Sequence, residues 1–378
     1  MDAPEIRYAR SGDASIAYAV LGDGPVDLVF IPGGFQHLEL WWEDPPRARL
    51  GQALLEHARL IQLDKRGTGL SDRGGPVASL ETRMDDIRAV MDAAGSERAV
   101  VFAVHDTAPL ALLFAATFPE RVAGLVLWHP QSAFVRTPDQ PWLPTRGEYE
   151  AWFGEQERRW GEHDYWDGFL KQIAPSLASR AERLSFARVL RLSVSPGDAR
   201  AFAQLNGEID VRHVLPTIRV PTLVLATAAW EPELRSARYH AERIPTARLA
   251  VLPGPDWIPS VGDPVPLIAE LAPFLEEVRE GSACGGRAGS RHRPLHGHRR
   301  VDAARGRGRR QRMARAAPQP SWCRPPGVGA LSWPEDGHCR RRVLRDLRRP
   351  RTGDPLRMRG ARGCQRTRTP DPGRAARR

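Results

Sequence analysis

The strongest constraint on the fold is an alternation of short apolar runs with helical segments between residues 26 and 278. Strands that alternate with helices in this way form right-handed βαβ units around a parallel sheet. Gly95 stands where the helix before it should end. The expected strands are 26–31, 58–63, 99–104, 122–127, 221–225 and 248–252, and the expected helices are 82–94, 108–117, 235–243 and 264–278.

Residues 131–215 interrupt this alternation. The segment is charged, has helical periodicity and carries Trp142, Trp152, Trp160 and Trp166. A helical insertion at this place can cover a cleft at the carboxyl ends of the strands, as a cap does. We expect these tryptophans to form the core of the cap rather than a ligand cage.

Charge divides the chain into two unlike parts. Residues 281–378 hold 27 Arg, no Lys and 6 acidic residues, whereas residues 1–280 have a net charge of −10 although the whole chain is +11. The basic part has Gly, Pro and Arg clusters and few aliphatic residues, so it cannot bury a core. We predict a domain at 1–280, with its cap at about 131–215, and a disordered basic tail at 281–378.

The cysteines and the apolar runs bear on metal binding and on the location of the protein in the cell. All four cysteines lie in the basic part, and His338 and Cys339 lack a zinc-finger spacing with the others. No apolar run approaches the roughly 18–20 residues of a membrane span. The first residues lack the regions of a signal peptide. We predict a cytoplasmic protein with no metal, no cofactor and no membrane partner.

Several segments carry a family resemblance. They are Asp64–Asp72 (DKRGTGLSD), Met84–Asp92 (MDDIRAVMD), Leu112–Val122 (LLFAATFPERV), Asp210–Pro216, Val220–Leu225 and Val261–Asp263. Together they resemble the α/β-hydrolase superfamily, and more specifically the hydrolase-like N-terminal domain that some bacteria fuse to a class III adenylate or guanylate cyclase domain. The resemblance covers residues 7–278. It implies an α/β-hydrolase fold, with helices on both faces of a mostly parallel sheet and a helical cap.

A serine hydrolase of this superfamily needs a nucleophile on a strained turn between a strand and a helix, followed along the chain by an acid and a histidine base. The strand and the helix are present around residues 102–109, but the sequence there reads FAVHDTAP and has no serine. Aligned without gaps, His105 takes the nucleophile position. Ala103 and Thr107 stand where the turn favours glycine.

The other two members of the triad are also missing. The strand ending at Leu225 is followed by ATAAWE, where Glu231 is the carboxylate nearest to the acid position. The strand ending at Leu252 is followed by PGPDWIP, where Trp257 stands in place of the histidine. Because no base is available to activate a nucleophile, we expect a hydrolase scaffold without serine-hydrolase activity.

An alternative active hydrolase would use Asp106. Epoxide hydrolases and haloalkane dehalogenases look similar, with an aspartate nucleophile after a histidine. Val104 is bulky for the glycine position of that turn, and the loop at 252–259 has no histidine to activate water. We therefore expect Asp106 to be an N-cap or first-turn carboxylate, stabilised by helix N–H groups and the helix dipole. Hydrolysis of an epoxide, haloalkane or ester through Asp106 remains the alternative.

A ligand site is expected between the cap and the sheet whether or not chemistry survives. Gly33 and Gly34 stand at the loop that binds an oxyanion in hydrolases, and we expect their N–H groups to be free for a ligand oxygen. With His105, Asp106 and Trp257, these glycines would line a pocket at the carboxyl ends of the strands. The predicted partner is a small molecule in this pocket.

The resemblance also bears on the basic tail. Back-translation of Pro294–Ala303, read one nucleotide forward, allows LFTDIVGST, which resembles the first metal-binding strand of a class III cyclase. The same shift over Asp336–Leu347 allows TAGDGFFATF, which resembles the second metal-binding hairpin. Two matches in one frame and in family order indicate a frameshift near residues 279–290. The tail is then an out-of-frame remnant of a cyclase domain, and no cyclase activity is expected from this chain.

Three functions therefore compete. In the first, a ligand-binding or regulatory module belongs to a cyclase-type signalling protein. In the second, an active hydrolase uses Asp106. In the third, the tail binds nucleic acid, but arginine without interleaved aromatic residues or a module signature favours only non-specific binding. A homodimer is compatible with the sequence.

Overall fold

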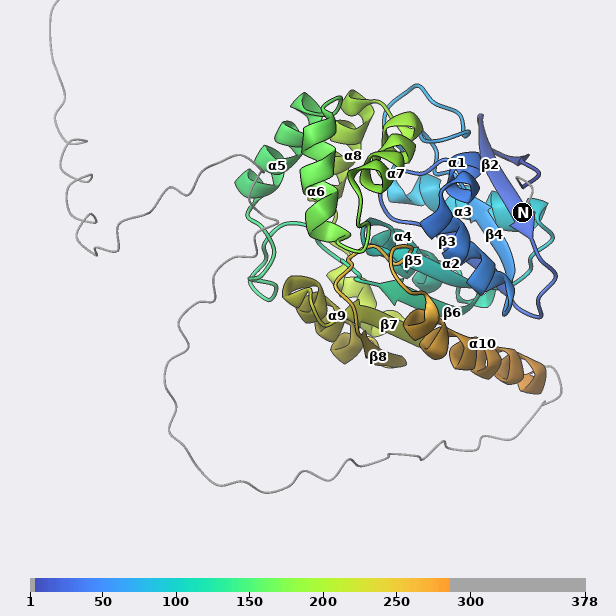
Figure 1. The fold of residues 1–378 in the computed structure, drawn as a ribbon. Helices are drawn as coiled ribbons and strands as arrows, with labels where there is room; N and C mark the ends of the chain where they lie inside the picture. Colours follow the sequence, from blue (N-terminus) through green and yellow to red (C-terminus); the bar gives the residue numbers. More distant parts are fainter. Residues whose placement is uncertain (1–3, 286–378) are drawn as a thin grey trace, which may run out of the picture. The chain divides into compact units, whose positions relative to one another are not determined.

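The computed structural model describes residues 4–285, with side chains up to residue 281 (Figure 1). Within these residues the chain forms an eight-stranded sheet in the order β1-β2-β4-β3-β5-β6-β7-β8. β2 pairs antiparallel with β1 and β4, and the other pairs are parallel. The strands are β1 (Arg7–Ser11), β2 (Ala14–Leu21), β3 (Asp27–Ile31), β4 (Arg59–Leu63), β5 (Ala99–Val104), β6 (Val122–Trp128), β7 (Thr222–Thr227) and β8 (Ala247–Leu252).

Helices cover both faces of the sheet, as predicted. Residues of α3 (Leu80–Ala93), α4 (Ala108–Thr117) and α9 (Glu231–Arg243) share the hydrophobic cluster on one face. Residues of α1 (Leu38–Glu43), α2 (Pro45–Leu55) and α10 (Val265–Gly285) share the cluster on the other face. Every residue of β5 is buried, because a central parallel strand is covered on both sides.

Some boundaries differ from the prediction. The β1–β2 hairpin and the short helices α1 and α2 were not predicted. α9 begins at Glu231 rather than at residue 235, and α10 continues past the predicted domain boundary at residue 280. The predicted disorder of the tail and the two cyclase-like segments lie outside the described residues.

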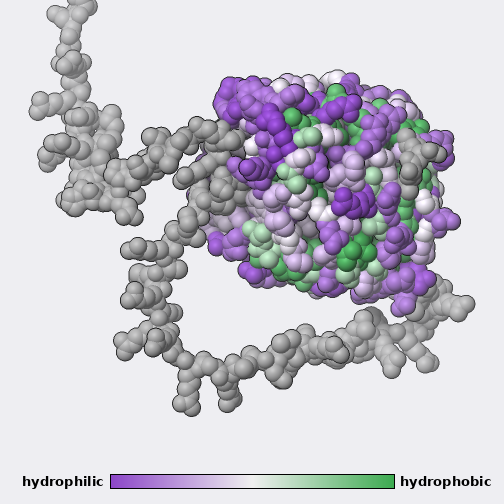
Figure 2. Space-filling model, viewed as in Figure 1, coloured by the Kyte–Doolittle hydropathy of each residue, from purple (hydrophilic) through white to green (hydrophobic). Residues whose placement is uncertain are grey.

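A helical cap, residues 146–208, connects β6 to β7. Its helices are α5 (Arg146–Arg158), α6 (His163–Ile173), α7 (Arg180–Ser193) and α8 (Pro196–Glu208). The hydroxyls of Thr145, Ser179 and Ser195 accept backbone N–H groups and so begin α5, α7 and α8. In Figure 2 the outer surface of the cap around α5, at the upper left, is mostly hydrophilic, whereas its inner residues form a separate aromatic cluster.

The glycine-rich turn after β4 is a structural junction. The buried carboxylate of Asp64 accepts hydrogen bonds from the backbone N–H groups of Leu38 and Leu70, at 3.1 and 2.8 Å. The Ser71 hydroxyl donates to the Asp64 carbonyl oxygen at 2.6 Å and accepts from the Ala17 N–H at 2.9 Å. The turn thereby fixes β2, β4 and α1 against one another.

Gly69 is the position where this turn tolerates a side chain least. It has a φ of +53°, and a Cβ atom there would lie 2.1 Å from the Asp64 carboxylate and 2.7 Å from the Gln36 carbonyl oxygen. We expect Gly69→Ala to destabilise the domain by about 2–5 kcal/mol, from overpacking and left-handed backbone strain together. Thermal unfolding measures this, at roughly 2–4 °C per kcal/mol for a domain of this size.

Gly12→Ala is the matched control for Gly69→Ala. Gly12 also has a positive φ, +61°, but nothing lies within 4 Å of the added Cβ. Only the backbone strain of about 1–2 kcal/mol should appear. Equal losses for the two variants would show that the contacts of Asp64 do not hold the turn.

Candidate functional site

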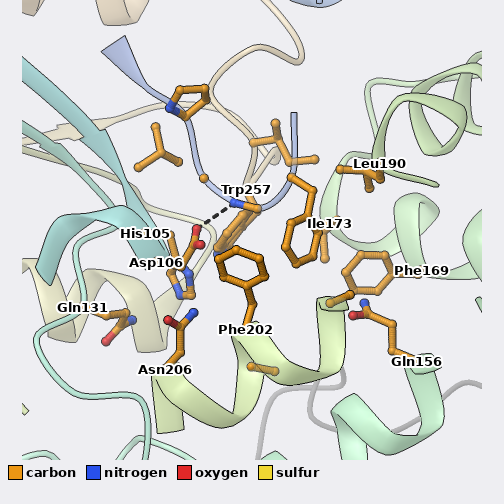
Figure 3. A pocket seen from close by; sticks show the side chains of 18 of the residues that line it. His105, Asp106, Gln131, Gln156, Phe169, Ile173, Leu190, Phe202, Asn206 and Trp257 are labelled. Atoms are coloured by element: carbon orange, nitrogen blue, oxygen red, sulfur yellow. Dashed lines mark hydrogen bonds between the residues drawn. The ribbon is translucent and has the colours of Figure 1, made fainter. Parts of the chain in front are cut away.

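The carboxyl ends of the parallel strands bring the predicted site together, as Figure 3 shows. Gly33 and Gly34 follow β3, His105 follows β5, and Trp257 follows β8. These residues and Asp106 line one cavity of about 270 Å³ between the sheet and the cap. All five residues predicted for the ligand pocket are therefore neighbours in the structure.

His105 occupies a strained turn of the kind that presents a nucleophile. Its φ is +48°, which is uncommon for a residue with a side chain. The Thr107 hydroxyl secures the turn, because it accepts the Val104 N–H at 2.9 Å and donates to the Ile31 carbonyl oxygen at 2.8 Å. Burial lowers the pKa of His105 to about 4, so its imidazole is neutral at physiological pH.

Trp257 lies directly against His105. The two ring centroids are 4.7 Å apart and the planes meet at 65°. The backbone of Trp257 is held from both sides, since its N–H donates to the Ile173 carbonyl oxygen and its own carbonyl accepts the Trp128 indole N–H, both at 2.8 Å. Trp257 thus fills the space beside the turn at His105.

The carboxylate next to Trp257 belongs to Glu233, not to Glu231. Glu231 lies on the surface, 55 % exposed, in an ion pair with Arg235. Glu233 is 2 % exposed, and its Oε1 accepts the indole N–H of Trp257 at 3.1 Å. Glu233 was not predicted, because Glu231 is the first carboxylate after β7. One turn of helix carries both residues, and the apolar Leu234, which directly follows Glu233, was the signal that this side of the turn faces inward.

Burial controls the charge of Glu233. Desolvation raises the pKa of Glu233 to about 7, against the smaller opposing effect of the Trp257 hydrogen bond. Its Oε2 has no hydrogen-bond partner among the described residues. The carboxyl group next to Trp257 is therefore partly protonated near neutral pH.

Asp106 does not cap the helix that follows it. Its Oδ1 accepts the Gly34 N–H at 2.7 Å, the contact drawn in Figure 3, and its Oδ2 lies 3.4 Å from the ammonium group of Lys65. Lys65 also donates to the Gly34 carbonyl oxygen. The Gly34 N–H is therefore not free for a ligand oxygen, contrary to expectation. No pattern in the sequence singles out Lys65, which stands inside the glycine-rich turn.

The cap supplies the opposite wall of the cavity. Trp152, Trp160 and Trp166 line it, although Trp160 and Trp166 also belong to the core of the cap. The ring of Phe35 meets those of Trp160 and Phe202 edge-on, at 6.3 and 5.6 Å. The expectation that the tryptophans serve only the core is thus too narrow. Trp142 lies away from this cavity and donates to the Ser236 hydroxyl.

His105 contacts Trp257 and Trp257 contacts Glu233, but these three side chains cannot relay a proton. An indole N–H donates and cannot accept a proton, so Trp257 cannot pass a proton between positions 105 and 233. Ser260 lines the cavity, and no hydrogen bond joins its hydroxyl to a histidine within the described residues. Among those residues no group of three or more His, Cys, Asp or Glu side chains could hold a metal ion. None of their helices is long and apolar enough to cross a bilayer.

Solved structures of several other proteins are similar to this fold. A hydrolase from Pseudomonas aeruginosa PA01 is 26 % identical with a TM-score of 0.56, covering 72 % of this chain and 99 % of its own. An esterase from Rhodococcus sp. ECU1013 is 24 % identical with a TM-score of 0.60, covering 72 % and 99 %. An esterase from Exiguobacterium antarcticum is 19 % identical with a TM-score of 0.62, covering 71 % and 98 %.

By sequence comparison, no curated protein matches the chain significantly. The model of the α/β hydrolase fold matches residues 28–228, which is more than half of the chain and includes β3, the turn at His105 and the whole cap. This chain belongs to the α/β hydrolase fold family.

Proposed function

We propose that this domain binds a small molecule in the cavity between sheet and cap without performing serine-hydrolase chemistry. The observation that carries the proposal is the contact series His105–Trp257–Glu233. It occupies the nucleophile, base and acid positions of the fold with a histidine in place of the serine and with an indole, which cannot accept a proton, in place of the base. A cavity lined by aromatic side chains with few polar groups is typical of a small-molecule site.

The Asp106 carboxylate supports the same conclusion. In α/β hydrolases an N–H from the loop after the strand equivalent to β3 stabilises the oxyanion of the transition state. Here that loop's Gly34 N–H is bound by the carboxylate of Asp106. A negative charge at this place disfavours a second one, so it opposes the charge that an ester hydrolysis would develop.

Asp106 is also poorly placed to be the nucleophile itself. Both of its oxygens are engaged, one by Gly34 and the other by Lys65. The residue in contact with the adjacent His105 is Trp257, which cannot activate water. These contacts of Asp106 and His105 favour a binding domain over an epoxide or haloalkane hydrolase.

We expect the full chain to hydrolyse neither p-nitrophenyl esters nor styrene oxide above the rate in buffer. The ester arm tests for a serine nucleophile, which the turn at His105 does not contain, and the epoxide arm tests Asp106. If the chain turns over styrene oxide and Asp106→Asn abolishes this turnover, the proposal is wrong and the domain is an epoxide hydrolase with Asp106 as its nucleophile. Ester turnover that Ser260→Ala abolishes would show that a serine outside the turn serves as the nucleophile.

We also propose that the domain is the regulatory part of a cyclase-type signalling protein. Its support is the resemblance in residues 64–122 and the two cyclase-like segments in the shifted frame. Resequencing the locus tests this. One inserted or deleted nucleotide near codons 279–290 that opens the cyclase frame supports it, and an unchanged frame with transcripts and peptides of the basic tail contradicts it.

A further inference from the structure

The cavity contains little uncompensated charge, although five Arg, His, Asp or Glu residues line it. They are Arg47, His105, Asp106, Glu148 and Glu233. The pairing of each one decides which ligands the cavity can hold, because a charged ligand leaves water at a large cost unless an opposite charge receives it.

Two of these charges, on Arg47 and Asp106, are each paired within the protein. Arg47 and Asp44 form an ion pair at 3.0 Å with side chains 3 % and 4 % exposed, and the Arg47 guanidinium also lies 3.4 Å from the ring centre of Phe186. Asp106 is paired with Lys65 and with the Gly34 N–H. Neither charge is available to a ligand without breaking its pair.

The remaining three groups do not supply a counter-charge either. His105 is neutral, because burial lowers its pKa to about 4, and Glu233 is partly protonated, because burial raises its pKa to about 7. Glu148 stands at the rim, where it accepts the N–H and the hydroxyl of Thr145. An anion would therefore enter this cavity without a partner. A cation would meet only the buried, partly protonated Glu233 and the carboxylate of Glu148, which Arg136 already approaches at 3.9 Å.

Several polar atoms in the wall lack a hydrogen-bond partner within the described residues, among them Glu233 Oε2 and Asn206 Oδ1. Asn206, on α8, is 8 % exposed and lines the cavity, and its Oδ1 accepts no hydrogen bond within the described residues. In Figure 3 its amide points from α8 toward the ring of His105. A buried acceptor without a donor is costly unless something occupies the site. The two ring nitrogens of His105 likewise make no hydrogen bond to the described part of the chain.

We propose that the cavity binds a small uncharged aromatic compound whose hydroxyl or N–H group donates to Asn206 beside His105. The cavity is at the small end of the roughly 300–1,000 Å³ typical of ligand sites, which suits one or two rings. Phe35, Phe202 and Trp257 offer ring edges and faces to a flat ligand. This inference rests on the proposed function, since it names the ligand class of that same site.

The test uses four naphthalenes of matched size with the full chain, measured by isothermal titration calorimetry at pH 7. They are 2-naphthol, 2-methoxynaphthalene, 2-naphthoate and 2-naphthylmethylammonium. We expect 2-naphthol to bind roughly tenfold tighter than its methyl ether, which cannot donate, because a hydrogen bond contributes at most about that factor. Neither ion should bind measurably. Preference for either ion, or binding of none of the four, overturns the inference.

Two variants test whether the ligand donates its hydrogen bond to Asn206. Asn206→Leu keeps the volume of the side chain, and we expect it to weaken 2-naphthol by about tenfold while binding of the methyl ether is retained. Gln140→Met is the matched control, since Gln140 is also a buried amide without a partner but lies outside the cavity. Unchanged naphthol binding in a folded Asn206→Leu variant overturns the assignment of Asn206.

Incubation with 2-naphthyl acetate separates this inference from the proposed function. If the ester is recovered intact while the naphthalene series gives the wrong order, only the ligand class is wrong. If the ester is hydrolysed at the rate of an enzyme, the proposed absence of chemistry is wrong instead.

Discussion

Replacing His105 by serine and Trp257 by histidine is expected to give measurable ester hydrolysis, and a further Asp106→Ala change is expected to raise it by about 10²-fold. Positions 105, 257 and 233 already touch in series, so the double variant places Ser, His and Glu in the order that a triad requires. Alanine at 106 then releases the Gly34 N–H, and one oxyanion donor is worth about 10²–10³ in rate.

The measurement is kcat/KM for p-nitrophenyl acetate. The matched control carries His105→Ala in place of the serine, with the other two changes kept, and it should stay at the rate in buffer. Lys65 keeps the Gly34 carbonyl as a partner when Asp106 is removed, so the loop should remain in place. A triple variant that folds and shows no gain over the control would mean that the three positions are not arranged as a triad.

The pH dependence of stability should report the charge of Glu233. The folded-state pKa of about 7 lies above the ordinary 4.5, so the native state holds this proton more tightly than the unfolded chain does. Stability from Glu233 is therefore full below pH 4.5 and is lost as the pH rises to 7, by about 3 kcal/mol. Glu233→Gln, which can still accept the Trp257 N–H, should melt several degrees higher than the parent at pH 8.

The gain in the free energy of unfolding from Glu233→Gln should shrink to below about 1 kcal/mol at pH 5. His105 and His240 have lowered pKa values of about 4, so their own contribution rises with pH in the same range, but it is common to parent and variant and leaves the difference unaffected. Glu231→Gln is the control, since that carboxylate is exposed. A gain for Glu233→Gln that is equal at pH 5 and pH 8 would show that Glu233 does not titrate in this window.

The sequence was sufficient for the layers of the fold and for the three loops that form the site. Apolar periodicity located β3, β5 and β8, and parallel strands bring their carboxyl ends to one edge, so Gly34, His105 and Trp257 could be placed together without coordinates. The β1–β2 hairpin escaped because β1 is short, half-exposed and ordered chiefly by its pairing with β2.

What the sequence could not supply were contacts between side chains of distant segments. The hydrogen bond from Gly34 to Asp106 joins residues 72 positions apart, and it competes with the local capping that the sequence favoured. Glu233 differs from Glu231 only in which face of α9 it occupies, and that depends on how the helix packs on β7. Asn206 acquires its position only when the cap closes over the sheet.

Intact-mass spectrometry after treatment with a fluorophosphonate tests the central claim most directly, because this reagent labels only an activated serine. The account predicts no adduct on the full chain under conditions that label a serine esterase completely, since position 105 holds a neutral histidine and position 257 a tryptophan. A stoichiometric adduct on a single serine of the cavity, Ser260 above all, would contradict it and show that the domain is a working hydrolase.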